Sequence, residues 1–208
     1  MRTLPGALLL GLLVLPAAAA EKQTAVAAGS PPASVGALRW LPFPGPPLEL
    51  RGLPWFQENA PELWRLPQSA RSRIPAGAWR RAVASDGARI RLASTPARLA
   101  IRVQATPATN RPCFIDAYVG DTYAGSARVV GGQPVELLLF EGRGGALKPL
   151  TIYLPNNHEI RVLAVGVDPG ATLRPPPAFA RPQPIVCYGS SVMQGTGSDH
   201  PGTTYPAV

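Results

Sequence analysis

A short block near the end of the chain combines a continuous apolar run, a glycine and two hydroxyl residues. Residues 185–188 (IVCY) are followed at once by Gly189, Ser190 and Ser191. An uninterrupted apolar run of this kind is typical of a strand buried on both faces, as in a parallel sheet. A tight turn after such a strand holds a serine at the strand's carboxyl end, where open α/β sheets bind ligands. The block therefore predicts a nucleophilic serine, with neighbouring backbone N–H groups facing a developing oxyanion.

Residues 188–195 (YGSSVMQG) and 202–207 (GTTYPA) resemble the first conserved block of the SGNH/GDSL serine hydrolases. The most similar subgroup reads G-[ST]-S-I-T-Q-G, followed by R-P-G-x-x-Y-P-A. The resemblance implies that Ser191 is the catalytic nucleophile and that its own backbone N–H is one oxyanion donor. Ser190 takes the place of the aspartate in the G-D-S form of the motif, and Met193 stands where the subgroup has threonine.

An upstream motif extends the resemblance over most of the chain. The subgroup often carries an N-terminal β-rich domain with a G-x-D-L-Y motif, and residues 114–118 (FIDAY) stand where that motif would fall. Only Asp116 and Tyr118 match it, because Phe114 and Ala117 replace the glycine and the leucine. The resemblance implies removal of acyl or acetyl groups from esters, carbohydrate esters among them. We therefore expect a small-molecule or glycan ester as the substrate, and no cofactor.

The base that a serine nucleophile needs is missing from the sequence. A serine hydroxyl is a poor nucleophile near neutral pH unless a base takes its proton and a third group orients that base. In the family these groups form a D-x-x-H pair near the C-terminus, whereas this chain ends at Val208. We therefore expect a truncated, N-terminal fragment of a hydrolase, without esterase turnover of its own. Whether the truncation is natural or comes from an incomplete gene model stays open.

Other polar residues have more than one interpretation. Asp199 and His200 are adjacent, and side chains one residue apart do not form the orienting hydrogen bond of a triad, so we assign both to the loop after the nucleophile. His158 is interpreted as a solvent-facing turn residue, with ligand binding as the alternative. Asp116 and Tyr118 share one face of a strand. A structural pair between this carboxylate and a neighbouring arginine is the simpler interpretation, and a substrate contact is the other.

The histidines and cysteines predict no metal site, because two of each without ligand spacing fall short of one. Cys187 lies in the apolar run and Cys113 in the β-rich region upstream, so we expect two separate buried thiols. A disulfide between them is permitted in an exported protein, and that alternative stays open.

The region from residue 37 to residue 172 reads as an all-β domain. Dense prolines between residues 38 and 79 exclude long helices and favour short edge strands and loops. Residues 89–92 and 99–103 alternate between polar and apolar, which predicts a half-buried antiparallel hairpin. Short strands at regular spacing predict a β-sandwich. Glycine and asparagine turn signals separate the further expected strands at 114–119, 123–130, 135–140, 151–154 and 160–167.

The predicted architecture is thus an N-terminal β-sandwich at 37–172, joined to the start of a second domain. Residues 184–208 would supply the first strand and nucleophile loop of an α/β domain of the flavodoxin-like SGNH type, which is incomplete here. Proline-rich residues 173–183 predict a stiff linker between the two.

The N-terminus is typical of an exported protein. Residues 1–20 combine a positive start, a short apolar run and a small-residue cleavage site, as a secretory signal peptide does. We expect cleavage after about Ala20 and a secreted or periplasmic protein, with a retained N-terminal anchor as the alternative. Small polar residues at 21–36 predict a flexible leader.

The net charge of +8 does not predict a nucleic-acid partner. The arginines lie singly along the chain, and only Arg80 and Arg81 are adjacent, so there is no basic tract. No segment after the signal peptide is apolar enough for stable membrane insertion. The oligomeric state stays open.

A second hypothesis comes from a different class of function. The sandwich pattern, with aromatic residues such as Tyr118 and Tyr123, would also suit a non-catalytic carbohydrate- or surface-binding accessory module. Glycan binding by the β-rich region without any ester cleavage would separate the two hypotheses.

Overall fold

The computed structural model describes residues 35–105, 113–204 and 207. The predicted signal peptide, nearly all of the predicted leader and residues 205–206 of the 202–207 motif lie outside the described residues.

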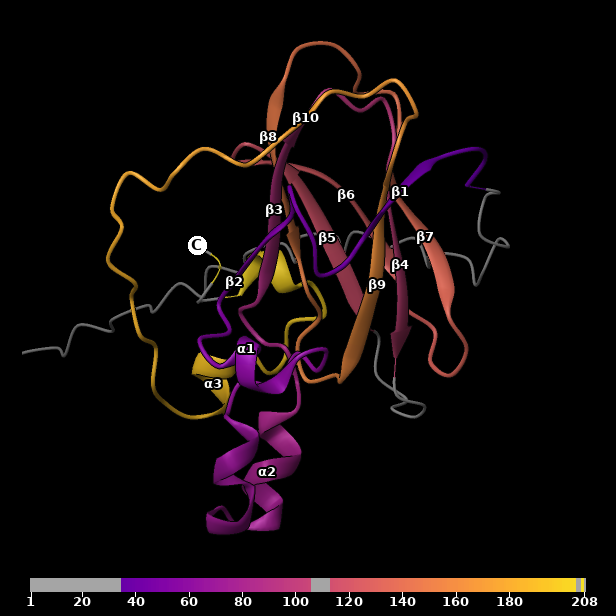
Figure 1. The fold of residues 1–208 in the computed structure, drawn as a ribbon. Helices are drawn as coiled ribbons and strands as arrows, with labels where there is room; N and C mark the ends of the chain where they lie inside the picture. The colour runs from indigo at the N-terminus through magenta and orange to yellow at the C-terminus, as the bar shows by residue number, and fades with distance from the viewer. Residues whose placement is uncertain (1–34, 106–112, 205–206, 208) are drawn as a thin grey trace, which may run out of the picture. The chain divides into compact units, whose positions relative to one another are not determined.

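The described strands form two sheets, and every pairing is antiparallel. One sheet has the strand order β1-β9-β4-β7, and the other has the order β10-β3-β8-β5-β6, with β2 also paired to β3 (Figure 1). The prediction of a mainly β fold is confirmed. The bounds are β1 Arg39–Pro42, β2 Glu49–Arg51, β3 Arg89–Ser94, β4 Leu99–Ala105, β5 Phe114–Val119, β6 Thr122–Arg128, β7 Val135–Phe140, β8 Lys148–Tyr153, β9 Ile160–Val167 and β10 Leu173–Arg174.

One hydrophobic cluster joins the two sheets. It includes Ile101 and Val165 from β4 and β9, and Ile90 and Ile152 from β3 and β8, all fully buried. Alternate side chains of a strand lie on the same face of its sheet, and each sheet turns an apolar face toward this cluster. Because burial of apolar surface is the dominant favourable term in folding, the two sheets pack together as layers.

The predicted hairpin between residues 89–92 and 99–103 is wrong in its pairing. Both strands exist, as β3 and β4, but they lie in different sheets. β3 pairs with β8, whereas β4 pairs with β9 and β7. The alternating pattern identifies the buried face of each strand, and both faces do reach the same cluster. It contains no information about which neighbour satisfies the backbone hydrogen bonds.

Short helices occupy part of the region between residues 38 and 79, where we expected edge strands and loops. Pro67 and Pro75 stand directly before two of these helices, as their N-cap residues. A proline disturbs no hydrogen bond at a helix start, because the first N–H groups have no intrahelical partner. The dense prolines therefore mark helix starts as well as strand edges. The helices are α1 Phe56–Asn59, the 3-10 helix η1 Gln68–Arg73 and α2 Ala76–Ala82.

The chain between β10 and α3 (Ser191–Gln194) is a long irregular segment (Figure 1). Its beginning belongs to a sheet, because β10 pairs with β3. Its middle is attached to β3 as well: the Phe179 ring lies 3.7 Å from the Arg91 guanidinium, which also donates a hydrogen bond to the Pro177 carbonyl at 2.7 Å. The second 3-10 helix, η2 (Pro201–Thr203), follows α3.

Candidate active site

Ser191 is the first residue of the short helix α3. The preceding Ser190 has an extended backbone and caps the helix, since its Oγ accepts a hydrogen bond from the Val192 N–H at 3.4 Å. The helix ends at Gly195, whose φ of 86° lies in the left-handed region that glycine adopts without strain. Ser191 itself is exposed. The local sequence thus presents this side chain to solvent at the start of a capped turn.

Within the described part of the chain, the hydroxyl and the backbone N–H of Ser191 make no hydrogen bond. The first N–H groups of a helix have no intrahelical acceptor, so the Ser191 N–H can donate to an anion beside the hydroxyl. A serine hydroxyl without a bonded base is only a weak nucleophile. The arrangement therefore offers an accessible but unactivated serine.

The apolar run before Ser191 is not the buried strand that we predicted. Ile185, Val186 and Tyr188 are 91%, 86% and 97% exposed, and residues 185–188 are irregular. Cys187 is exposed too, so the expectation of a buried thiol is wrong for this residue, while Cys113 is buried as expected. A strand buried on both faces needs neighbouring strands and covering helices. The described residues provide neither around this segment.

Asp116 is a buried polar residue that contacts the segment after Ser191. Its side chain is 1% exposed, and it is engaged by a segment far along the chain. His200 Nδ1 lies 2.9 Å from Asp116 Oδ1, and the Gly202 N–H donates to Oδ2 at 2.9 Å. The Phe114 ring stacks on the imidazole, with ring centroids 4.5 Å apart. The neighbouring arginine that we expected as the partner of Asp116 is therefore replaced by a histidine and a backbone amide.

Asp199 is exposed, and the carboxylate that orients His200 is Asp116 instead. Sequence reasoning missed this pair because 84 positions separate its members. One signal was available: residues 114–118 and residues 201–207 each resemble a motif of the same subgroup. Two motifs that occur together in related proteins can be in contact, and here Asp116 contacts His200 and Gly202.

Tyr118 and His158 both have partners within the protein. The Tyr118 hydroxyl donates to the Gly202 carbonyl at 3.3 Å, and its ring packs edge-on against Tyr123 and Tyr153. Burial, with a smaller contribution from the Asp116 charge, raises the pKa of Tyr118. His158 is half-buried, and its Nδ1 lies 2.7 Å from the Asn156 carbonyl, so it is less exposed than the predicted turn residue.

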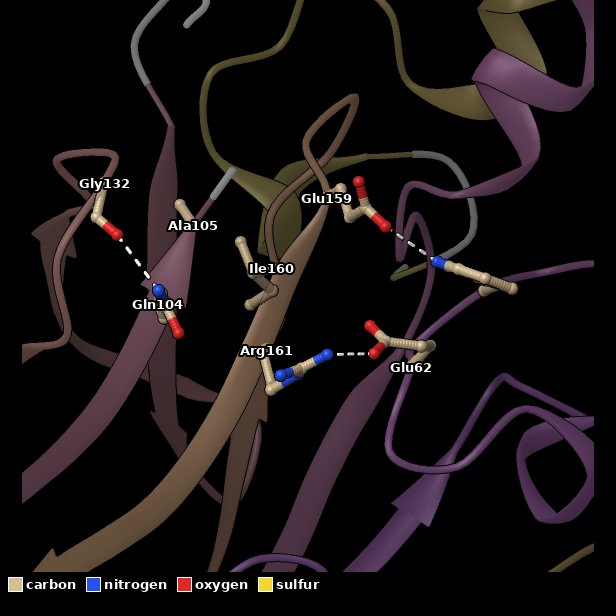
Figure 2. Close-up of a pocket in the computed structure, with 8 residues that line it drawn as sticks. Glu62, Gln104, Ala105, Gly132, Glu159, Ile160 and Arg161 are labelled. Atoms are coloured by element: carbon tan, nitrogen blue, oxygen red, sulfur yellow. Dashed lines mark hydrogen bonds and ion pairs between the residues drawn. The ribbon is translucent and has the colours of Figure 1, made fainter. Parts of the chain in front are cut away.

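A cavity of about 350 Å³ lies where β4 ends and β9 begins (Figure 2). Its polar lining groups are paired with one another: the Trp64 Nε1–H donates to Glu159 at 2.8 Å, Gln104 donates to the Gly132 carbonyl at 3.2 Å, and Arg161 forms an ion pair with Glu62. Among the described residues, none after Arg161 contributes to its lining. The described lining residues are Glu62, Trp64, Gln104, Ala105, Gly132, Glu159, Ile160 and Arg161.

A search of the described residues finds no group of three or more histidine, cysteine, aspartate or glutamate side chains that could hold a metal ion. Among the same residues, no helix has the length and apolar character that crossing a membrane requires.

Two solved structures share the fold of this chain. The salicylyl-acyltransferase SsfX3 of a tetracycline biosynthetic pathway superimposes with a TM-score of 0.66 at 23% identity, over 82% of this chain and 50% of that one. A protein of Bacteroides ovatus described as a GDSL-like lipase gives a TM-score of 0.68 at 22% identity, over 82% of this chain and 52% of its own. This chain therefore spans about half the length of either structure. No family model and no curated protein matches the sequence.

Proposed function

We propose that this chain is the N-terminal part of an exported serine ester hydrolase of the SGNH/GDSL type, with Ser191 as its nucleophile. The observation that carries this function is an exposed serine at the first position of a capped helical turn, beside an unengaged backbone N–H. The likeness in fold to an acyltransferase and to a GDSL-like lipase supports it. A β-sandwich at 37–172 and the beginning of a hydrolase domain at 184–208 complete the proposed architecture, and residues 1–20 support export.

The chemistry follows from what Ser191 presents. Its Oγ attacks the carbonyl carbon of an ester, and the Ser191 N–H donates to the oxygen that becomes negative. The alcohol then leaves, and water hydrolyses the acyl group from Oγ. The substrates are acyl or acetyl esters, including those on carbohydrate. The base that accepts the serine proton comes from residues outside these 208, since Ser191 has no bonded base among the described residues and the two solved structures are about twice as long.

The function is tested by hydrolysis of p-nitrophenyl acetate. A longer protein, in which residues 1–208 are followed by the rest of a hydrolase domain, should turn the ester over, and Ser191→Ala should lower the rate by at least about a thousandfold. The neighbouring Ser190→Ala variant should lose far less, because Ser190 only caps the helix. The 208 residues alone should be no faster than their own Ser191→Ala variant. Turnover by the longer protein that survives Ser191→Ala would contradict the assignment.

The cavity at the end of β4 favours a second candidate, a carbohydrate-binding accessory module. Trp64 offers an aromatic wall. Gln104 and Glu62 are paired with Gly132 and Arg161, and each would bond a sugar hydroxyl through the side-chain oxygen that its pair does not use. Tyr118, by contrast, is no exposed platform, because it is packed and bonded to Gly202. A glycan array probed with the 208-residue chain should show binding that Gln104→Ala weakens. An array on which the chain binds no glycan would remove this candidate.

A further inference from the structure

The segment that carries Ser191 has little apolar surface to hold it in place. Val192 is 76% exposed, and residues 184–190 are exposed throughout. A helix of four residues is far too short to be stable by itself, because helices below about 12 residues are marginal in water. Its conformation must therefore depend on polar contacts with the rest of the protein.

We propose that two buried carboxylates of the β-rich region, Asp86 and Asp116, hold the loop that carries Ser191 and so position the serine, a role that rests on the function proposed above. They would be positioning residues, since neither is in contact with Ser191 in the structure.

Asp86 engages the end of α3. Its side chain is 2% exposed, and its Oδ2 accepts a hydrogen bond at 3.1 Å from Nε2 of Gln194, the last residue of the helix. The Asn157 N–H donates to Oδ1 at 2.7 Å, and Arg65 Nε lies 3.3 Å from Oδ2. Burial raises the pKa of Asp86, while Arg65 and these hydrogen bonds act in the opposite direction. Burying this carboxylate is costly, and the contacts from Arg65, Asn157 and Gln194 offset part of that cost.

Asp116 engages the other end of the same loop. Both of its partners, His200 and Gly202, lie near the C-terminal end of residues 191–204, the loop that carries Ser191. Tyr118 on the same strand donates to the Gly202 carbonyl, so β5 contacts both backbone polar groups of Gly202. Two independent attachments, about eight residues apart in the loop, therefore define its path between Gln194 and Gly202.

Further contacts, both between these two attachments and beyond Gly202, hold the loop near the end of β8. The Thr196 hydroxyl donates to Asn157 at 3.4 Å, just after β8, and the Tyr153 hydroxyl donates to the Ala207 carbonyl at 3.2 Å. Gly195 is buried, and a Cβ there would lie 2.6 Å from Thr204 and 3.2 Å from Asn156. The β-rich region therefore determines the conformation of residues 191–204, the loop that carries Ser191.

Amide hydrogen exchange of the 208-residue chain, followed by mass spectrometry, tests the proposal. Gln194→Ala removes the Asp86 attachment and His200→Ala removes the side-chain part of the Asp116 attachment, in both cases from the loop side. Each should accelerate exchange in residues 191–204 by about tenfold or more, since hydrogen bonds to charged groups are lost. The exchange rates of peptides from β4 and β9 should be unchanged, which would show that the variants stay folded. Gln133→Ala, at an exposed glutamine elsewhere, should alter neither region.

A conservative variant separates positioning from general stability. Asn Nδ2 takes the place of His Nδ1, so His200→Asn keeps a donor for Asp116 and should restore most of the protection that His200→Ala removes. Unchanged exchange in residues 191–204 for both alanine variants would overturn the proposal, and so would acceleration shared equally by β9. Hydrogen exchange does not depend on ester cleavage, so the exchange experiment tests the positioning of the loop independently of the hydrolysis assay. An unreactive Ser191 on a loop still held by both attachments would contradict only the proposed function.

Discussion

At the scale of single residues, Asp116 and Gly202 show how two distant motifs depend on one another. Asp116 accepts the Gly202 N–H, and the glycine packs directly on the Tyr118 ring, where a Cβ would lie 2.5 Å from one ring carbon and 2.9 Å from another. The sequence allowed Asp116 and Tyr118 to be singled out as a pair on one strand face. Charge and spacing did not predict their partner, because neither connects its loop to β5, and only the resemblance of both motifs to one subgroup pointed to the contact.

A methyl group at position 202 tests this close approach. Gly202→Ala should lower the free energy of unfolding by about 1–3 kcal/mol, because the methyl group would displace the Tyr118 ring from its contacts with Tyr123 and Tyr153. Gly170→Ala is the matched control, since nothing lies within 4 Å of a Cβ there. Urea unfolding gives both values. Equal stabilities for the two variants would mean that the η2 segment does not pack on Tyr118 in solution.

The two cysteines should differ sharply in reactivity. Burial raises the pKa of Cys113 to about 12, so only about one part in ten thousand is thiolate at pH 8, and the side chain is 5% exposed. Cys187 is exposed. Titration of the native chain with Ellman's reagent at pH 8 should therefore detect one thiol, two after denaturation, and none in native Cys187→Ser. Rapid reaction of both thiols in the native chain would contradict the burial of Cys113.

At the scale of elements, the positions of strands were easier to predict than their partners. Turn signals on either side gave β5, β7 and β9 their predicted bounds. Pairing depends on contacts between segments far apart in the chain, and the hairpin assigned to β3 and β4 was wrong for that reason. The short helices were missed because the prolines beside them were interpreted only as breakers, although Pro67 and Pro75 stand at helix starts.

One carboxylate connects the start of β4 to the end of β9. Asp168 accepts the Arg98 N–H at 2.7 Å and the Arg98 Nε–H at 2.8 Å. Burial by itself would raise the pKa of Asp168, but the hydrogen bonds from Arg98 outweigh it and hold the pKa below the ordinary 3.8. At pH 7, Asp168→Asn should therefore lower the free energy of unfolding by about 1–3 kcal/mol.

The same carboxylate predicts a pH dependence. A group whose pKa is lower in the folded state stabilises the fold above its unfolded-state pKa, and this contribution is lost as the pH falls. The difference between wild type and Asp168→Asn should therefore shrink between pH 7 and pH 3, across the ordinary value of 3.8. Asp121→Asn, at an exposed turn residue, is the control. An equal difference at both pH values in urea unfolding would show that the carboxylate charge is not what matters.

At the scale of the whole molecule, the β-rich region and the segment from Ser191 to Thr204 meet through polar contacts and a few ring contacts, without a shared apolar core. The described core cluster contains no residue beyond Leu173, and the apolar run at 185–188 is exposed. The serine motif was recognisable from the sequence because it depends on a few consecutive residues. The buried strand predicted for residues 185–188 is absent from the structure, because burial of a strand requires neighbouring strands and the described residues provide none there.

The most direct test of the central claim is the site of phosphonylation by a fluorophosphonate probe. In the longer protein that we propose, peptide mapping by mass spectrometry should place one adduct on Ser191, with labelling lost in Ser191→Ala and kept in Ser190→Ala. An adduct on any other residue, or labelling that persists in Ser191→Ala, would contradict the account.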